Sequence, residues 1–331
     1  MDGSATSDDL PISGYAKRLE TVLGKLNGRV KHSGKNAFDH VRKAWALRSI
    51  DPAMAAFRAI TAEEEAATAL IVALKQRQYP NADKINFRNH DHKASIGALI
   101  SVLSTEVFSK IGHKPRVLLS ENPNPLFARI QIDLNELMGI SGQEPQFAEP
   151  QLPLDFTLGD RDGSIKDLAS EFRDFAGERG HKAAKEFIKS EANLRNQILY
   201  ATDSGIPRVA IKDDFILVRK DRVLTILTIA VMIAQTSDHQ AFVLQCLGII
   251  LHRLEKIDEI APQRQPLSDE TARLYIEKNL NTFRTEIAKG EKKQTIVSGY
   301  TTETIFTLQW LPVWAVRYDG NKAAGREHKS N

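Results

Sequence analysis

The sequence predicts a mainly α-helical protein that carries a small β-containing insertion and a C-terminal extension. Apolar residues recur every three or four positions in several long segments, as they do on the buried face of a helix. Strand-like apolar runs with turn residues between them gather in residues 115–163. The chain shows no internal repeat and no low-complexity tract.

The composition indicates a soluble globular protein. Hydrophobic residues make up 42% and charged residues 26% of the 331 positions, enough for a substantial core. The net charge of +3 is too small to indicate nucleic-acid binding by itself. The longest apolar segment, residues 223–234, is shorter than the roughly twenty residues that cross a membrane, and the polar start lacks the features of a signal peptide. We therefore expect a cytoplasmic protein with no membrane partner.

The chain holds one cysteine, Cys246, within an apolar helical segment. A single cysteine excludes an internal disulfide and any metal site built from several cysteines, and it fits a reducing compartment. We expect a buried structural thiol, no bound metal and no cofactor.

The N-terminal segment, residues 1–36, is expected to be flexible apart from a short helix over 14–27. A basic stretch broken by glycine follows this helix, and such a charge run is typical of a solvated linker. The alternative is a phosphate-binding patch made by Lys25, Arg29, Lys31, His32 and Lys35.

Three helices are predicted next, over 37–50, 52–78 and 91–110. Asp51 is expected to cap the second helix, and Pro52 suits its first position. The apolar stripes of the second and third helices are continuous, so both are expected to pack in the core.

The insertion contains two predicted short strands, 117–119 and 127–132, joined by a turn rich in proline and asparagine. The proline-rich residues 144–153 are expected to form an irregular linker.

Helical patterning returns over 164–200 with an interruption at two glycines, and a hairpin-like element with strands at 209–211 and 215–218 follows it. Two strongly apolar helices are predicted over 221–235 and 238–257.

The C-terminal extension is predicted to hold a helix over 268–289 and a strand pair around 295–297 and 304–308. The chain then divides into a flexible N-terminal segment, the first part of a helical bundle, the insertion, the second part of the bundle, the extension and a disordered tail. Their boundaries are 1–36, 37–114, 115–163, 164–260, 261–318 and 319–331.

The most informative motif is Leu194-Arg-Asn-Gln-Ile-Leu-Tyr200, at the end of a predicted helix. Residues four positions apart share a helix face, so Asn196 lies one turn before Tyr200, and Arg195 lies beside the pair. The motif is compatible with an active site, but these residues alone favour an amphipathic helix whose arginine is solvated and whose tyrosine packs at the helix end.

Glu64 falls on the apolar stripe of the helix over 52–78, between Ile60 and Ile71. A buried carboxylate is costly unless a cation or hydrogen-bond donors compensate its charge. Arg195 is the natural partner, and the pair would serve either as a structural tie between helices or in catalysis.

A third group of polar side chains lies where the helix over 91–110 begins. His90 and His92 are two residues apart, a spacing that suits no helical metal site. The segment is typical of a helix cap in a polar turn, or of a cluster that faces phosphate or a partner, since Arg88 and Lys93 add positive charge at a helix N-terminus. The sequence contains no P-loop, dinucleotide-binding, serine-hydrolase or kinase motif.

Three segments in this order resemble the abortive-infection AbiV proteins of the HEPN group. They are residues 62–71 with paired glutamates, 87–93 with a Phe-x-x-His-x-x-Lys turn, and 194–200 with an Arg-x-x-x-Leu-Tyr pattern. The resemblance covers roughly residues 37–110 and 165–260.

The resemblance implies a HEPN-like helical bundle that forms a homodimer, acts against phage, binds RNA and cleaves it without metal. The arginine of the motif would steady the phosphate while a neighbouring group moves the proton of the attacking 2′-hydroxyl. The implied catalytic residues are Arg195, Asn196, Tyr200 and Glu64, and the implied substrate-binding residues are His90, Lys93 and Arg88.

Two departures from the pattern leave an alternative open. Thr68 stands where the family has lysine, and Tyr200 stands where HEPN nucleases have histidine. An unperturbed tyrosine is only about 0.1% ionised at pH 7, so it is a poor general base. The alternatives are a catalytically inactive member that halts infection by binding a phage or host protein, and a helical scaffold.

Overall fold

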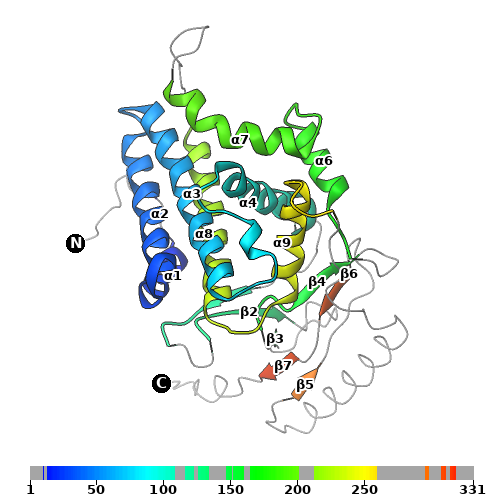
Figure 1. The fold of residues 1–331 in the computed structure, drawn as a ribbon. Helices are drawn as coiled ribbons and strands as arrows, with labels where there is room; N and C mark the ends of the chain where they lie inside the picture. Colours follow the sequence, from blue (N-terminus) through cyan, green and yellow to red (C-terminus); the bar gives the residue numbers. More distant parts are fainter. Residues whose placement is uncertain are drawn as a thin grey trace, which may run out of the picture.

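The computed structural model describes most of the chain up to residue 258 and three short strands beyond it (Figure 1). The described residues are 10, 13–108, 116–122, 126–133, 147–150, 152–159, 165–200, 212–258, 295–297, 307–310 and 314–317. They are mainly helical, which confirms the predicted fold class. No helix among them is long and apolar enough to span a membrane.

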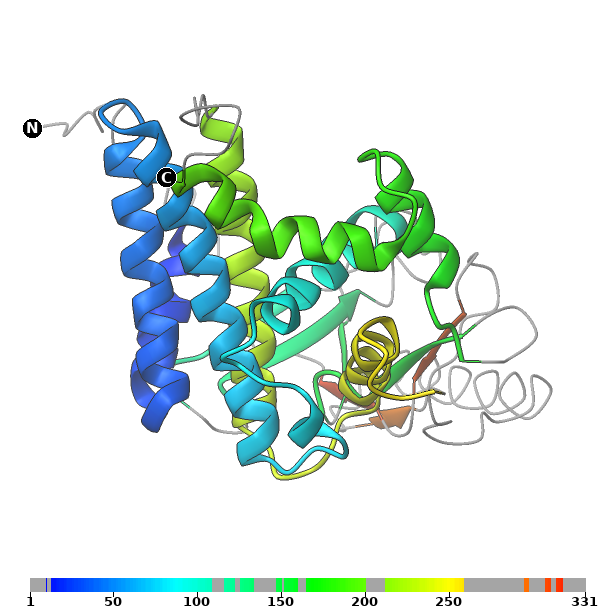
Figure 2. The ribbon, with the colours of Figure 1, turned by 45° about the horizontal axis from the view of Figure 1, so that its top comes forward.

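Four helices stand side by side and form the core of the bundle (Figures 1 and 2). They are α1 (Gly14–Lys25), α2 (Gly28–Leu47), α3 (Pro52–Gln76) and α8 (Asp213–Ala234). The predicted cap of α3 is confirmed, because the Asp51 side chain accepts a hydrogen bond from the Met54 backbone N–H at 3.0 Å.

The basic stretch predicted as a linker is part of a helix, since α2 begins at Gly28. Val30, Gly34 and Ala37 continue the buried register of this helix. A Cβ at Gly34 would lie only 3.0 Å from a methyl group of Leu23 on α1, so this glycine permits close helix packing. It does not break the helix.

The predicted strand over 215–218 is also wrong, because these residues form the first turns of α8. Their β-branched side chains favour a strand locally. Burial of Ile216 against Trp45 and the acidic residues Asp213 and Asp214 at the positive end of the helix stabilise the helical alternative. The first strand of the predicted hairpin, 209–211, lies outside the described residues.

The remaining helices surround this core. They are α4 (His90–Val102), a π-helical turn (Leu103–Phe108), α6 (Ala169–Gly177), α7 (Ala184–Leu199) and α9 (Ala241–Arg253). Figure 2 shows α7 running crosswise to the four upright helices.

The predicted strand pair of the insertion is confirmed as β1 (Arg116–Leu119) and β2 (Ala128–Asp133), which are antiparallel. Two further strands follow, β3 (Phe147–Pro150) and β4 (Phe156–Gly159). The expected irregular linker therefore contains β3.

The C-terminal strands are β5 (Thr295–Val297), β6 (Thr307–Trp310) and β7 (Trp314–Arg317). The strand order is β1-β2-β3-β7-β5 in one sheet and β4-β6 in the other. The predicted pairing of 295–297 with 304–308 is wrong, because β5 pairs with β7 and β6 pairs with β4. The predicted helix over 268–289 and the tail after residue 319 lie outside the described residues.

Three glutamine side chains join the helices to the backbone of the β-containing segment. Gln235 exchanges two hydrogen bonds with Ala128, at 2.8 and 2.7 Å. Gln240 accepts from the Leu154 N–H at 2.8 Å, and Gln245 accepts from the Leu158 N–H at 2.8 Å. Because a primary amide both donates and accepts, it substitutes here for a neighbouring strand.

We predict that Gln245→Leu lowers the free energy of unfolding by about 2–3 kcal/mol, because it removes hydrogen bonds to the Leu158 and Lys166 backbones at a position that water does not reach. Urea denaturation measures the change. Gln197→Leu, on the exposed face of α7, is the control and is expected to stay within about 0.5 kcal/mol of the native protein. Equal effects of the two changes would contradict a stabilising role for the hydrogen bonds of Gln245.

Candidate functional site

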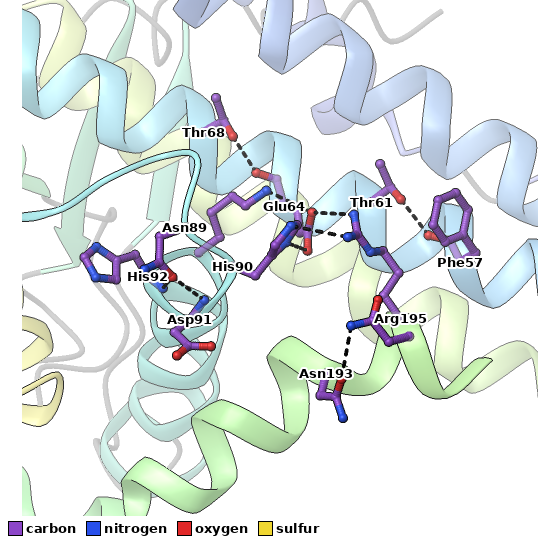
Figure 3. A network of polar contacts seen from close by, with 12 residues as sticks. Phe57, Thr61, Glu64, Thr68, Asn89, His90, Asp91, His92, Asn193 and Arg195 are labelled. Atoms are coloured by element: carbon purple, nitrogen blue, oxygen red, sulfur yellow. Dashed lines mark hydrogen bonds and ion pairs between the residues drawn. The ribbon is translucent and has the colours of Figure 1, made fainter. Parts of the chain in front are cut away.

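Three nitrogen-bearing side chains from two other segments contact the carboxylate of Glu64, which lies on α3 (Figure 3). Lys93 Nζ lies 2.9 Å from Oε2, and His90 Nδ1 lies 2.7 Å from Oε1. Arg195 Nη1 lies 3.8 Å from Oε2. The predicted partnership of Glu64 with Arg195 is therefore present. We call these four residues the Glu64 cluster.

The start of α4 presents two members of the cluster together. Asn89 caps this helix by accepting a hydrogen bond from the Asp91 N–H at 2.9 Å. The cap fixes the first turn, in which His90 and Lys93 are three residues apart and hence on one face. That face meets α3 at Glu64.

Glu64 fixes the orientation and the tautomer of His90. The Nδ1–H donates to the carboxylate, which leaves Nε2 as an acceptor. Arg195 Nη2 lies 3.3 Å from this Nε2 and is its donor. An imidazole that is bound to a carboxylate through one nitrogen and can accept a proton at the other is suited to general-base chemistry.

The cluster is buried on one side and accessible on the other. The side chains of Glu64 and Lys93 are 13% and 10% exposed, whereas those of His90 and Arg195 are 40% and 30% exposed. Burial would raise the pKa of Glu64, but the hydrogen bond and charge of Lys93, with the hydrogen bond of His90, outweigh burial and hold the pKa below its usual value. The site therefore presents a cationic surface above an ionised carboxylate.

A second charged cluster, which sequence reasoning missed, surrounds the neighbouring Glu63. Arg219 Nη1 lies 2.6 Å from Glu63, and its Nη2 lies 3.2 Å from Glu191 on α7. Arg222 lies 3.5 Å from Glu63 and 3.7 Å from Glu191. Burial would lower the pKa of Arg219, but the two carboxylates raise it. Arg219 falls on the apolar face of α8, in the helical spacing of residues 216, 219, 223 and 226. This spacing would have identified Arg219 as a buried cation.

The two clusters together attach the middle of α7 to the core. Glu191 and Arg195 are four residues apart on α7. Arg195 contacts Glu64 directly, whereas Glu191 pairs with Arg219, which in turn binds Glu63. The buried apolar residues of α7 are confined to its two ends, at Phe187, Ile188 and Ile198. The position of Arg195 therefore depends on these ion pairs together with the packing of its neighbour Leu194 against Ile60 and Ile198.

Three predicted site residues make no contact with the Glu64 cluster among the described residues. Asn196 donates to Asn193 on the outer face of α7, and Tyr200 is 63% exposed after its last turn. The Arg88 guanidinium lies 5.8 Å from the centre of the Phe87 ring.

His92 is a structural residue. It is buried and accepts a hydrogen bond from the Asn86 N–H at 2.9 Å, and burial lowers its pKa. The described residues hold no group of three or more side chains suited to a metal ion. Burial raises the pKa of the Cys246 thiol, as expected for a structural cysteine.

A cleft of about 560 Å³ lies near the α1–α2 junction and the ends of α3 and α8. Its lining includes Lys25, Gly28, Arg77 and Gln235 but no member of the Glu64 cluster. Size alone would favour this cleft as a ligand site, whereas convergent polar groups favour the Glu64 cluster.

No protein-family model, no curated protein and no solved structure matches this chain.

We predict that Gly97→Ala lowers the free energy of unfolding by about 3 kcal/mol or more. A Cβ at Gly97 would lie 1.9 Å from Glu63 Oε1 and would force this carboxylate away from Arg219. Thermal and urea denaturation measure the effect. Gly177→Ala is the control, because nothing lies within 4 Å of the added methyl group. Comparable stability of the two variants would contradict the packing of Glu63 against α4.

We predict that the stability advantage of the native protein over Glu64→Gln is greatest near neutral pH. The folded pKa of Glu64 lies below its ordinary value of 4.5, so the contribution of the ionised carboxylate is present above that pH and is lost as the pH falls through the lowered folded pKa. Urea denaturation of both proteins over a pH series measures the difference, in which titrating groups that do not interact with Glu64 cancel. A difference that does not change with pH would contradict this assignment.

Proposed function

We propose that this protein binds RNA and cleaves it without a metal ion at the Glu64 cluster, as a homodimer that acts in defence against phage. The observation that carries the proposal is the pairing of an accessible guanidinium, Arg195, with an accessible imidazole, His90, on one buried carboxylate. Both groups are of the kind that act on phosphodiesters, one through charge and one through proton transfer.

The three segments that carry the resemblance to AbiV proteins support the proposal. Glu64 belongs to the first segment, His90 and Lys93 to the second, and Arg195 to the third. They are far apart in the sequence and share one cluster. His90 also provides the titratable ring that is missing at Tyr200.

In the proposed reaction the 2′-hydroxyl attacks the adjacent phosphorus. The P–O2′ bond forms and the P–O5′ bond breaks, which yields a 2′,3′-cyclic phosphate and a 5′-hydroxyl. His90 Nε2 accepts the proton of the 2′-hydroxyl and returns it to the departing O5′, while Glu64 stabilises the charged ring. Arg195 turns from Nε2 to the phosphate and stabilises the negative charge that grows in the transition state.

We predict that Arg195→Ala reduces RNA cleavage by about 10²–10³-fold, or about 3–4 kcal/mol of transition-state stabilisation. His90→Gln is expected to abolish the proton transfer while it keeps a hydrogen bond to Glu64. Single-turnover cleavage of a labelled RNA measures both effects, with analysis of the cyclic phosphate end.

Asn196→Ala is the matched control, because Asn196 lies next to Arg195 but outside the cluster. Tyr200→Phe separates the roles of the two rings: full activity assigns proton transfer to His90, and its loss assigns the transfer to Tyr200. A chelator is expected to have no effect, since three cationic or neutral nitrogen groups surround the single carboxylate. Undiminished cleavage by Arg195→Ala would place the active site elsewhere.

A second candidate is a catalytically inactive protein that acts by binding a phage or host protein. Exposed large apolar side chains favour this candidate. Ile50 lies in the turn between α2 and α3, Tyr200 at the end of α7, and Val218 near the start of α8. Absence of RNA cleavage together with co-purification of one defined protein would support this candidate. Sedimentation at micromolar concentration tests the homodimer in either case.

A further inference from the structure

The first half of α2 carries three cations and one histidine, and no acid of this segment neutralises them. Residues 28–38 contain Arg29, Lys31, His32 and Lys35 but no aspartate or glutamate. The described part of the chain offers these four side chains no ion pair. The nearby acids Glu20 and Asp39 pair with later cations, Arg42 and Lys43.

Arg88 joins this surface through one aromatic ring. The guanidinium carbons of Arg29 and Arg88 lie 4.7 and 5.8 Å from the centre of the Phe87 ring. These arginines come from α2 and from the turn before α4, and the ring holds them near each other. Arg88 is two residues before His90 in the sequence, so the chain leads from this surface directly into the Glu64 cluster.

This arrangement is unfavourable for the isolated protein. Arg29 and Arg88 contact the same aromatic ring, and the first turn of α2, at the positive end of the helix dipole, has no acidic residue. The surface also lacks the large exposed apolar side chains that mark the other end of the bundle. A partner recognised here is therefore recognised by its negative charge.

We propose that Arg29, His32, Lys35 and Arg88 bind the phosphates of single-stranded RNA on one side of the phosphodiester that the Glu64 cluster would cleave. This inference rests on the proposed function for the identity of the ligand. Exposed cations in a row bind successive phosphates with little sequence preference, and each contact makes binding more sensitive to salt.

The test compares two triple variants, each with three exposed cations replaced. Arg29→Gln/Lys35→Gln/Arg88→Gln removes three cations of the proposed surface. Arg173→Gln/Lys182→Gln/Lys189→Gln removes the same charge from α6, from α7 and from the segment between them. Fluorescence anisotropy with a short single-stranded 2′-O-methyl RNA, which lacks the attacking hydroxyl, measures binding over a range of salt concentrations. The first variant is expected to bind at least about tenfold more weakly and to lose about 2 from the slope of log K against log salt, about 0.7 for each phosphate contact. The second variant is expected to bind like the native protein.

Equal binding by the two triple variants would overturn the proposed surface, whatever the result of the cleavage assay. Competition by polyglutamate as effective as that by RNA would also overturn it, in favour of an acidic protein partner. If binding depends on the surface but native RNA is not cleaved, the surface stands and the proposed cleavage fails. Circular dichroism of each variant confirms that the fold is retained.

Discussion

The burial of two adjacent carboxylates on α3 determines how the other helices are placed. Glu63 and Glu64 are successive residues, so their side chains leave the helix about 100° apart. Each carboxylate must be compensated inside the protein, because removing an unpaired charge from water costs several kcal/mol. Arg219 and Arg222 of α8 approach Glu63, and the first turn of α4 approaches Glu64. Each carboxylate is thus compensated by side chains from other helices.

The cost of burying a charge on α3 explains why the sequence predicted Glu64 and its partner but not Glu63. The apolar spacing of α3 placed Glu64 in the core, and the cost of its charge led to Arg195, with which it pairs. The single apolar stripe assumed for this helix gave no reason to expect Glu63 in the core as well. The run of alanines in α3 is buried around most of the helix, and small side chains let α2 and α8 approach closely. Helices that are packed on several sides have no flank, so the stripe does not identify every buried charge.

Distant pairing explains most errors in the fold. β3 was missed because a four-residue strand ending in proline carries little local signal. It lies between β2 and β7, and β7 is more than 160 residues away in the sequence. The start of α8 was misassigned because its β-branched residues suit a strand until tertiary burial decides. By contrast, α3 was predicted almost to the residue, since its cap, its proline and its periodicity are all local. The three glutamines in apolar helices were informative in retrospect, because a buried amide requires a polar partner.

The geometry of the Glu64 cluster is consistent with a site that is ordered before a ligand arrives. Arg195 makes the longest of the three contacts to the carboxylate, 3.8 Å against 2.9 Å for Lys93 and 2.7 Å for His90. If Arg195 turns toward a phosphate, Lys93 and His90 still compensate Glu64, so the move does not leave a bare buried charge. Glu191 meanwhile remains paired with Arg219 and holds α7 in place. The side chain of Arg195 is therefore free to exchange partners, whereas α7 is held in place. A preorganised anion site requires a cationic side chain on a fixed backbone.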